Sequence, residues 1–203
     1  AMSGIRQMLK PIDWAGLAYF LLAAQFITVI TLAAAAAPGY QLRDGAISDL
    51  GVIAETDLLF NAALLLVGLL NLLGAYYAYR LERGRLLFGV CGIASIGAVG
   101  ASLLPLSTGG RHGLFALLAF VFFNLEIIGQ AMRTDNAALR WTGLVLATTG
   151  LVHVVVMAVG DAGSSLVFGP IGHGGVERLI VYPPMLWLMV YGGFRLGRPV
   201  PAA

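Results

Sequence analysis

Long apolar runs alternate with polar connections along most of the chain. A helix that crosses a bilayer needs about 20 predominantly apolar residues, and six runs meet this requirement. The predicted spans are 14–37, 58–79, 86–106, 113–132, 141–160 and 178–194. The pattern therefore predicts an all-α fold, a polytopic membrane bundle of six transmembrane helices, with residues 1–203 in a single transmembrane domain.

Basic residues beside the spans indicate how the chain is oriented, because cytoplasmic loops carry an excess of arginine and lysine. One side of the predicted bundle holds Arg6, Lys10, Arg80, Arg83, Arg85, Arg133, Arg140, Arg195 and Arg198, and the other holds Arg43, Arg111 and Arg178. The larger set predicts that both termini are cytoplasmic and that the protein is a multi-pass protein of the cell membrane.

Composition supports a membrane protein and excludes other classes. Hydrophobic residues make up 59% of the chain and charged residues 11%, against about 25% charged residues in soluble domains. The formal net charge is +2 and no basic stripe appears, which argues against a nucleic-acid partner. Cys91 is the only cysteine, so cysteine-based metal sites are excluded. The only lysine, Lys10, lies outside every span, which excludes a retinal Schiff base.

Two of the predicted spans carry residues that affect helix packing. Gly92, Gly97 and Gly100 recur in the third span, and small residues let helix backbones approach closely, so we expect this helix to be central. Pro183 and Pro184 interrupt the sixth span. Proline frees backbone carbonyls, so we expect a bend or break there.

Two connections on the predicted outer side are long, residues 38–57 and 161–177. Long loops in a compact domain are usually functional or disordered, and the apolar run within 46–54 argues against disorder in the first. The second alternates apolar residues with glycine, which predicts a segment that folds back over the bundle or dips into it.

All three histidines, His112, His153 and His173, map to the outer half of the bundle together with Asp49 and Glu177. Three histidines and a carboxylate would bind zinc and acidify a water molecule. Alternatively, one histidine with a serine or carboxylate would act as a general acid–base pair without metal. The structural alternative is that each histidine simply forms a hydrogen bond to a neighbouring helix or to water.

The candidate residues fall into two groups at this outer end. Candidates for catalysis are His112, Ser48 and Asp49, and candidates for binding are Asn61, His153, His173, Glu177 and Arg178. His153 shares a helical face with Thr149 and Thr142, and we expect this face to look into the bundle. We expect Asn61 to form a hydrogen bond across helices to the segment around Ser48 and Asp49.

Glu126 lies deep in the fourth span, nearer the cytoplasmic end. A carboxylate inside a membrane is a functional candidate and often lies on a proton path. The alternative is a carboxylate that reaches along its own helix face toward Gln130 and Arg133. Its distance from the histidines predicts a separate site.

The residues collected so far resemble the prokaryotic integral-membrane family catalogued as domain of unknown function 998. The opening motif of this family resembles Ile47-Ser48-Asp49-Leu50-Gly51, followed by Leu59-Phe60-Asn61 and Gly68. Its middle motif resembles Leu104-Pro105, followed by His112-Gly113, Ala116 and Phe120. Its last motif resembles Glu177-Arg178 with Trp187. The resemblance implies six helices and an outward-facing polar cluster that includes Ser48, Asn61, His112 and Arg178. It implies no established activity and no role for His153 or His173.

Three functions remain open at this point, and the sequence does not decide whether the protein is an enzyme. The outer polar residues would orient the head group of a membrane lipid or hydrophobic small molecule that the protein binds or moves. Alternatively, they would catalyse hydrolysis or transfer on a lipid-like substrate inside the membrane. In the third alternative they hold the helices together in a structural or assembly role. The binding or transport function is favoured because no complete catalytic constellation is visible. The sequence leaves the oligomeric state open.

Overall fold

The computed structural model describes residues 12–199, and this part of the chain is helical without strands. The long helices are α2 (Trp14–Ala36), α3 (Asp57–Glu82), α4 (Arg85–Leu103), α5 (Gly110–Arg133), α6 (Ala137–Asp161) and α7 (Gly172–Leu196). Short 3-10 helices are η1 (Ile47–Gly51), η2 (Leu106–Thr108) and η3 (Ser165–Ile171). The prediction of an all-α fold with six helices long and apolar enough to cross a membrane is confirmed.

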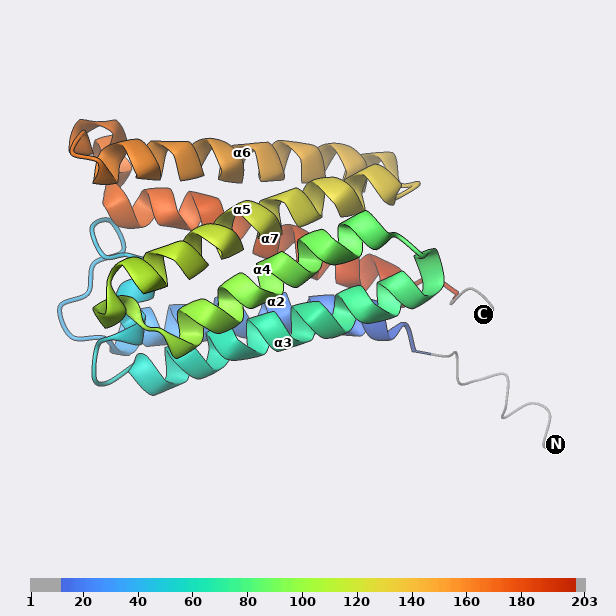
Figure 1. The fold of residues 1–203 in the computed structure, drawn as a ribbon, viewed down its shortest axis with the longest axis horizontal. Helices are drawn as coiled ribbons and strands as arrows, with labels where there is room; N and C mark the ends of the chain where they lie inside the picture. Colours follow the sequence, from blue (N-terminus) through green and yellow to red (C-terminus); the bar gives the residue numbers. More distant parts are fainter. Residues whose placement is uncertain (1–11, 200–203) are drawn as a thin grey trace.

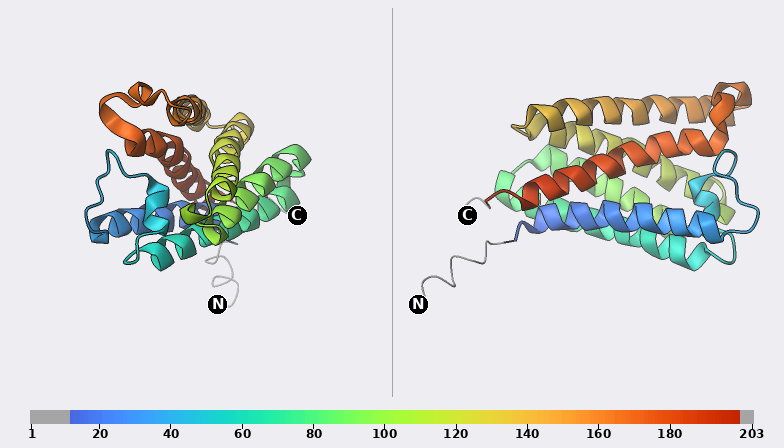
Figure 2. Two further views of the ribbon diagram at one scale, coloured as in Figure 1. Left: turned by 60° about the vertical axis from the view of Figure 1, so that its left-hand side comes forward. Right: turned by 180° about the vertical axis from the view of Figure 1, so that it is seen from behind.

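The six helices form a bundle in which each helix packs against its neighbours in sequence (Figures 1 and 2). Helix α7 also packs along α2, which closes the arrangement into a ring. We call the end that carries segments 37–56 and 162–171 the loop end. The opposite end, where α2 begins and α7 ends, is the terminal end (Figure 1). Which end faces the cytoplasm stays a prediction.

The outer surface of the bundle carries many large apolar side chains. Leu58 is 81% exposed, Leu86 83% and Trp141 66%. Exposed apolar surface on this scale indicates an apolar environment rather than water. The six long apolar helices and this apolar surface together indicate a multi-pass membrane protein.

Small residues allow the backbones of particular helix pairs to lie close together. Gly97 of α4 lies against the backbone of Phe115 and Ala119 in α5, and a methyl group there would clash with Ala119. However, α4 lies between α3 and α5 with Ile96 exposed on its outer side. The expectation that this helix is central is wrong. Helix α7 is the most buried, because half of its apolar stretch is covered, against 39% for α4.

Helix α7 begins at Gly172, earlier than predicted, and continues through Pro183 and Pro184 without a break. Pro184 has no N–H, so the carbonyl of Ile180 lacks the hydrogen bond that the backbone of residue 184 would donate in a regular helix. The side-chain amide of Asn124 on α5 donates to this carbonyl over 3.3 Å. A neighbouring helix therefore replaces the missing hydrogen bond, and the expected break does not occur.

Candidate functional site

The segment between α2 and α3 is folded against the start of α7 by two adjacent charged residues. Glu177 is buried, and its Oε2 atom accepts a hydrogen bond from the backbone N–H of Ile47 over 2.5 Å. Arg178 donates through Nη1 to the carbonyls of Leu42 (2.8 Å) and Gly45 (3.1 Å). These contacts join residues about 130 positions apart in sequence.

Tyr40 supports the Arg178 guanidinium from the loop side. Its hydroxyl accepts a hydrogen bond from Arg178 Nη2 at 2.6 Å and lies 2.7 Å from the carbonyl oxygen of Ala46, to which it donates. Burial raises the pKa of the Tyr40 phenol above its ordinary value, against the opposing effect of the arginine. Tyr40 therefore keeps its proton and the donor role that the Ala46 contact requires.

Asp49 and Asn61 also hold this segment in place. Asp49 Oδ2 accepts from the backbone N–H of Ala46 at 2.8 Å and so caps η1. Asn61 Nδ2 donates to the carbonyl of Gly51 at 2.9 Å. Asn61 was expected to bind the segment around Ser48 and Asp49, and it binds Gly51 at the end of that segment.

A vestibule of about 390 Å³ opens at the loop end between η1, α5, α6 and α7. Its polar lining residues are Ser48, Asp49, His112, Asp161, His173 and Glu177. His173 Nε2 lies 3.2 Å from Asp161 Oδ1, which joins the start of α7 to the end of α6. Among residues 12–199, no arginine or lysine lines this cavity.

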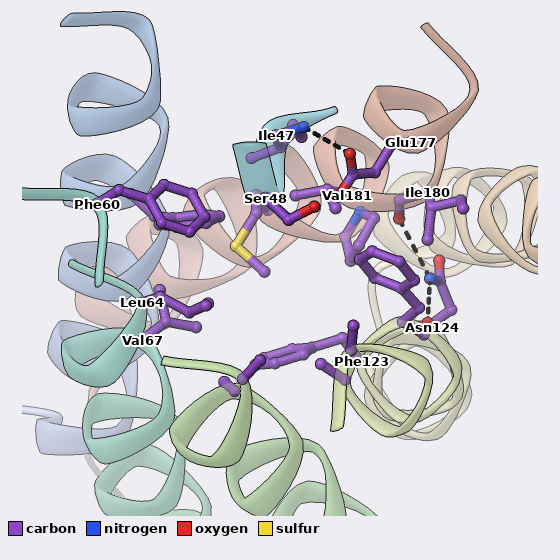
Figure 3. A pocket seen from close by; sticks show the side chains of 18 of the residues that line it. Ile47, Ser48, Phe60, Leu64, Val67, Phe123, Asn124, Glu177, Ile180 and Val181 are labelled. Carbon is purple, nitrogen blue, oxygen red and sulfur yellow. Dashed lines mark hydrogen bonds between the residues drawn. The ribbon is translucent and has the colours of Figure 1, made fainter. Parts of the chain in front are cut away.

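A second cavity of about 60 Å³, which we call the chamber, lies deeper in the bundle. Figure 3 shows Ser48 and Glu177 on one side of it and the ring of Phe123 on the opposite side. Most of its wall is apolar, with Phe26, Phe60 and Leu64 among the lining side chains. Ser48, His112 and Glu177 line both cavities, so these three residues mark the junction between the vestibule and the chamber.

His112 is oriented at this junction by the end of the preceding helix. Its Nδ1 atom lies 2.8 Å from the carbonyl oxygen of Leu104, and the residue is only 4% exposed. A carbonyl oxygen only accepts, so Nδ1 carries the proton. In the neutral ring, Nε2 is then an acceptor, available to a hydroxyl or amine donor or as a general base.

The structure does not bring His153 to the site. Its Nδ1 atom lies 2.8 Å from the carbonyl of Thr149 in the same helix, and His153 does not line the vestibule or the chamber. The expectation that its helix face looks into the bundle is wrong, because α6 packs inward through Gly143, Ala147 and Gly150.

The described residues do not provide a set of ligands for the zinc ion that the sequence suggested. Within residues 12–199, no group of three or more His, Cys, Asp or Glu residues is close enough to hold a metal ion. The polar residues that line both cavities are one serine, one histidine and one carboxylate. A zinc site that uses His112, His153 and His173 stays an untested prediction.

Glu126 lies away from the vestibule, as its position in the sequence predicts, but its partner is different. Its Oε2 atom accepts from Asn71 Nδ2 of α3 at 2.8 Å. Gln130 instead binds Tyr19 and Tyr191. The proposed reach of Glu126 toward Gln130 and Arg133 is therefore wrong.

Three residues of this region were missed from the sequence: Asp161, Asn124 and Tyr40. Asp161 ends a helix and looked like an ordinary boundary residue. The signal that could have identified Asn124 is the proline pair in α7, because a freed carbonyl in a membrane needs a donor from a neighbouring helix.

Comparison with known proteins identifies the family of the chain. Neither a curated protein nor a solved structure matches the chain. The family model described as "Protein of unknown function (DUF998)" matches residues 20–193, which span all six helices. The chain therefore belongs to the DUF998 family.

Proposed function

We propose that the protein binds an amphipathic small molecule or lipid at the loop end and moves it into or across the membrane. One observation carries the proposal: a vestibule with several polar lining residues adjoins an apolar chamber, and Ser48, His112 and Glu177 line both. Small-molecule sites are mostly apolar cavities with a few convergent polar groups. The vestibule would hold the head group, and the chamber would hold the apolar part next to it.

The polar lining favours a head group rich in hydrogen-bond donors. Asp49, Asp161 and Glu177 contribute carboxylates, and His112 Nε2 is an acceptor. Arg178 is engaged with loop carbonyls and Tyr40. With no arginine or lysine in the lining, a phosphate group would lack the charged donors it usually binds. We therefore propose an amine or polyhydroxyl head group.

We also propose that the protein lies in the cell membrane with its terminal end in the cytoplasm, so that the vestibule faces outward. The arginines at the terminal end support this orientation. Single cysteines placed at Glu55 and at Asp135 in a Cys91→Ala background test it with a membrane-impermeant thiol reagent. Labelling of position 55 alone in intact cells is expected, and labelling of position 135 alone would reverse the orientation.

The experiment that tests the binding proposal uses dodecylamine and dodecyl phosphate with purified protein in lipid nanodiscs. Dodecylamine is expected to raise the unfolding temperature and to appear as a bound species in native mass spectra, whereas dodecyl phosphate is not. Ala116 lines both cavities, so Ala116→Phe should abolish the effect. Ala62 lies on the exposed face of α3, and Ala62→Phe is the matched control.

Equal binding by Ala116→Phe and the wild type would contradict the proposed site. If His112→Gln lowers the unfolding temperature but leaves dodecylamine binding unchanged, His112 holds the helices together and does not take part in binding.

A specific observation also favours a second function, hydrolysis or group transfer on a lipid-like substrate. Ser48 and His112 line the same junction, and His112 Nε2 is free of the Leu104 contact. A serine hydroxyl activated by a neutral histidine is a nucleophile for acyl transfer. A fluorophosphonate probe that labels wild type but neither Ser48→Ala nor His112→Gln would support this function, and absence of labelling would remove it.

A further inference from the structure

We propose that Glu126 is a proton-binding site that exchanges protons with water at the terminal end of the bundle, through a narrow gap between α2, α3, α4 and α5. This inference concerns the half of the molecule that the proposed function does not use. It rests on the contacts around Glu126, the gap beside it and the packing that separates it from the chamber.

Glu126 is fully buried, and no arginine of the described residues 12–199 forms an ion pair with it. Its Oε2 atom accepts from Asn71, while its Oε1 atom has no hydrogen-bond partner. Within residues 12–199, Arg195 pairs with Asp13 and Glu82 rather than with Glu126. An unpaired buried carboxylate carries a large desolvation cost. The resting state of Glu126 is therefore the neutral carboxylic acid.

The neighbours of Glu126 favour a proton over a metal cation. The Asn71 Nδ2 group faces Glu126 Oε2 and also lies 3.3 Å from Ser95 Oγ and from the Cys91 carbonyl. An amide NH₂ directed at three oxygens occupies the centre where a cation would need to lie. A proton on the carboxyl group needs no such space.

The surroundings contain few other groups that titrate. Tyr19 of α2 and Cys91 of α4 line the gap, while Tyr191 and Arg195 contribute from α7 through the hydrogen bonds described below. The buried face of α6 presents Gly143, Ala147 and Gly150, none of which titrates. Glu126 is therefore the carboxyl group of this region, and the guanidinium of Arg195 pairs with Asp13 and Glu82 instead.

A gap of about 10 Å³ lies in the terminal half of the bundle and is lined by Cys91 and Gln130, although Glu126 itself does not line it. Glu82 and Arg133 line its mouth, and Tyr19, Cys91 and Gln130 line its deep part. A water molecule needs about 10–15 Å³ and two to four polar partners. The gap therefore has room for about one water molecule beside the Glu126 network.

A chain of hydrogen bonds runs along the same route. Arg195 Nη1 donates to the Tyr191 hydroxyl (3.1 Å), and Tyr191 donates to Gln130 Oε1 (3.1 Å). Gln130 Nε2 then donates to the Tyr19 hydroxyl at 3.0 Å. This chain holds the walls of the gap in place between the charged groups at the terminal end and the buried carboxyl group.

In the opposite direction, toward the chamber, the packing is mostly apolar, although the side chain of Asn124 also lines the chamber. Phe123 and Val67 line the chamber (Figure 3), and along α5 and α3 they lie nearer the terminal end than Phe120 and Phe60 do. Ile127 is fully buried next to Glu126 in sequence. Protons are therefore expected to reach Glu126 from the terminal end rather than through the vestibule.

The test is infrared spectroscopy of the protein in lipid nanodiscs with exchange from water to D₂O. Wild type at neutral pH should show the carbonyl band of a protonated carboxyl group that is missing from Glu126→Gln. Ala78 lines the gap, so Ala78→Leu should slow the deuterium shift of this band at least about tenfold. Ala62→Leu on the exposed face of α3 and Ala116→Phe at the vestibule should leave its rate unchanged.

Two results would overturn the proposal. Identical carbonyl bands in wild type and Glu126→Gln would mean that Glu126 is ionised, and loss of the band on adding sodium would make it a cation site. An exchange rate that responds to Ala116→Phe but not to Ala78→Leu would place the access route at the loop end. Neither readout requires a bound ligand, so the result is independent of the dodecylamine experiment.

Discussion

The two ends of the bundle both contain charged and polar side chains, but they use them differently. At the loop end, Arg178 and Glu177 hold a backbone segment, and polar groups are left lining an open vestibule. At the terminal end, Arg195 binds two carboxylates, and the polar groups fill the space between the helices. The comparison indicates that an arginine that binds backbone carbonyls shapes a cavity, whereas one that binds carboxylates closes the bundle.

The largest effect is expected from Arg195→Met at the terminal end. Arg195 Nε lies 2.9 Å from the buried Asp13 and Nη1 lies 2.7 Å from Glu82. Removing one member of a buried ion pair leaves the partner charges unpaired and costs about 3–5 kcal/mol. Unfolding in detergent should show a loss of this order.

The matched control for this change is Arg198→Met, because Arg198 forms an exposed pair with Asp135. Exposed pairs contribute little to stability. Equal losses in Arg195→Met and Arg198→Met would contradict the difference between buried and exposed pairs at this end.

A smaller, local effect is expected from Arg178→Gln at the loop end. The change removes contacts to Leu42 and Gly45, so the segment should open more often while the helices stay folded. Hydrogen exchange of backbone amides in residues 40–51 should accelerate about tenfold. Arg43→Gln, at an exposed arginine of the same segment, should change it much less. A loss of global stability in Arg178→Gln as large as that in Arg195→Met would contradict the proposed difference between the two arginines.

Between the two ends, Asn124→Leu should cost about 1 kcal/mol, because Ile180 O loses a donor. In a Pro184→Ala background the alanine N–H can bind Ile180 O, so the cost of Asn124→Leu should shrink. A double-mutant cycle measures this coupling. Equal costs of Asn124→Leu in both backgrounds would refute the explanation of the unbroken helix.

The smallest effect concerns pH. The hydrogen bonds from Arg198 lower the pKa of Asp135 below its ordinary value, so the pair stabilises the fold above the unfolded pKa. This stabilisation is lost as the pH falls through the folded pKa. Wild type and Arg198→Met should therefore differ slightly at neutral pH and converge in strong acid. A difference that grows on acidification would have the wrong sign.

The sequence predicted the helices well because a membrane span imposes a length and a composition that a single chain reveals. The family resemblance drawn from the motifs around Ser48, His112 and Arg178 is confirmed by the family match. His112 was expected at the outer mouth because it opens the fourth span, and the structure places it beside both cavities.

Contacts between distant segments were beyond the sequence. Ile47 and Glu177 lie 130 positions apart, and no periodicity relates them. His153 was placed on the inner face because a polar residue in a membrane was expected to seek the bundle, whereas the glycines of α6 determine which face packs inward. Glu126 was paired along its own helix, but Asn71 reaches it from α3.

The central claim is that the vestibule and the chamber form one binding site. The direct test is photo-crosslinking in nanodiscs with a dodecylamine analogue that carries a diazirine on its alkyl chain near the amine. The account predicts crosslinked peptides from residues 46–49, the first half of α5 and the first half of α7, all lost in Ala116→Phe. Crosslinks confined to the exposed apolar faces of the helices, unchanged by Ala116→Phe, would contradict it.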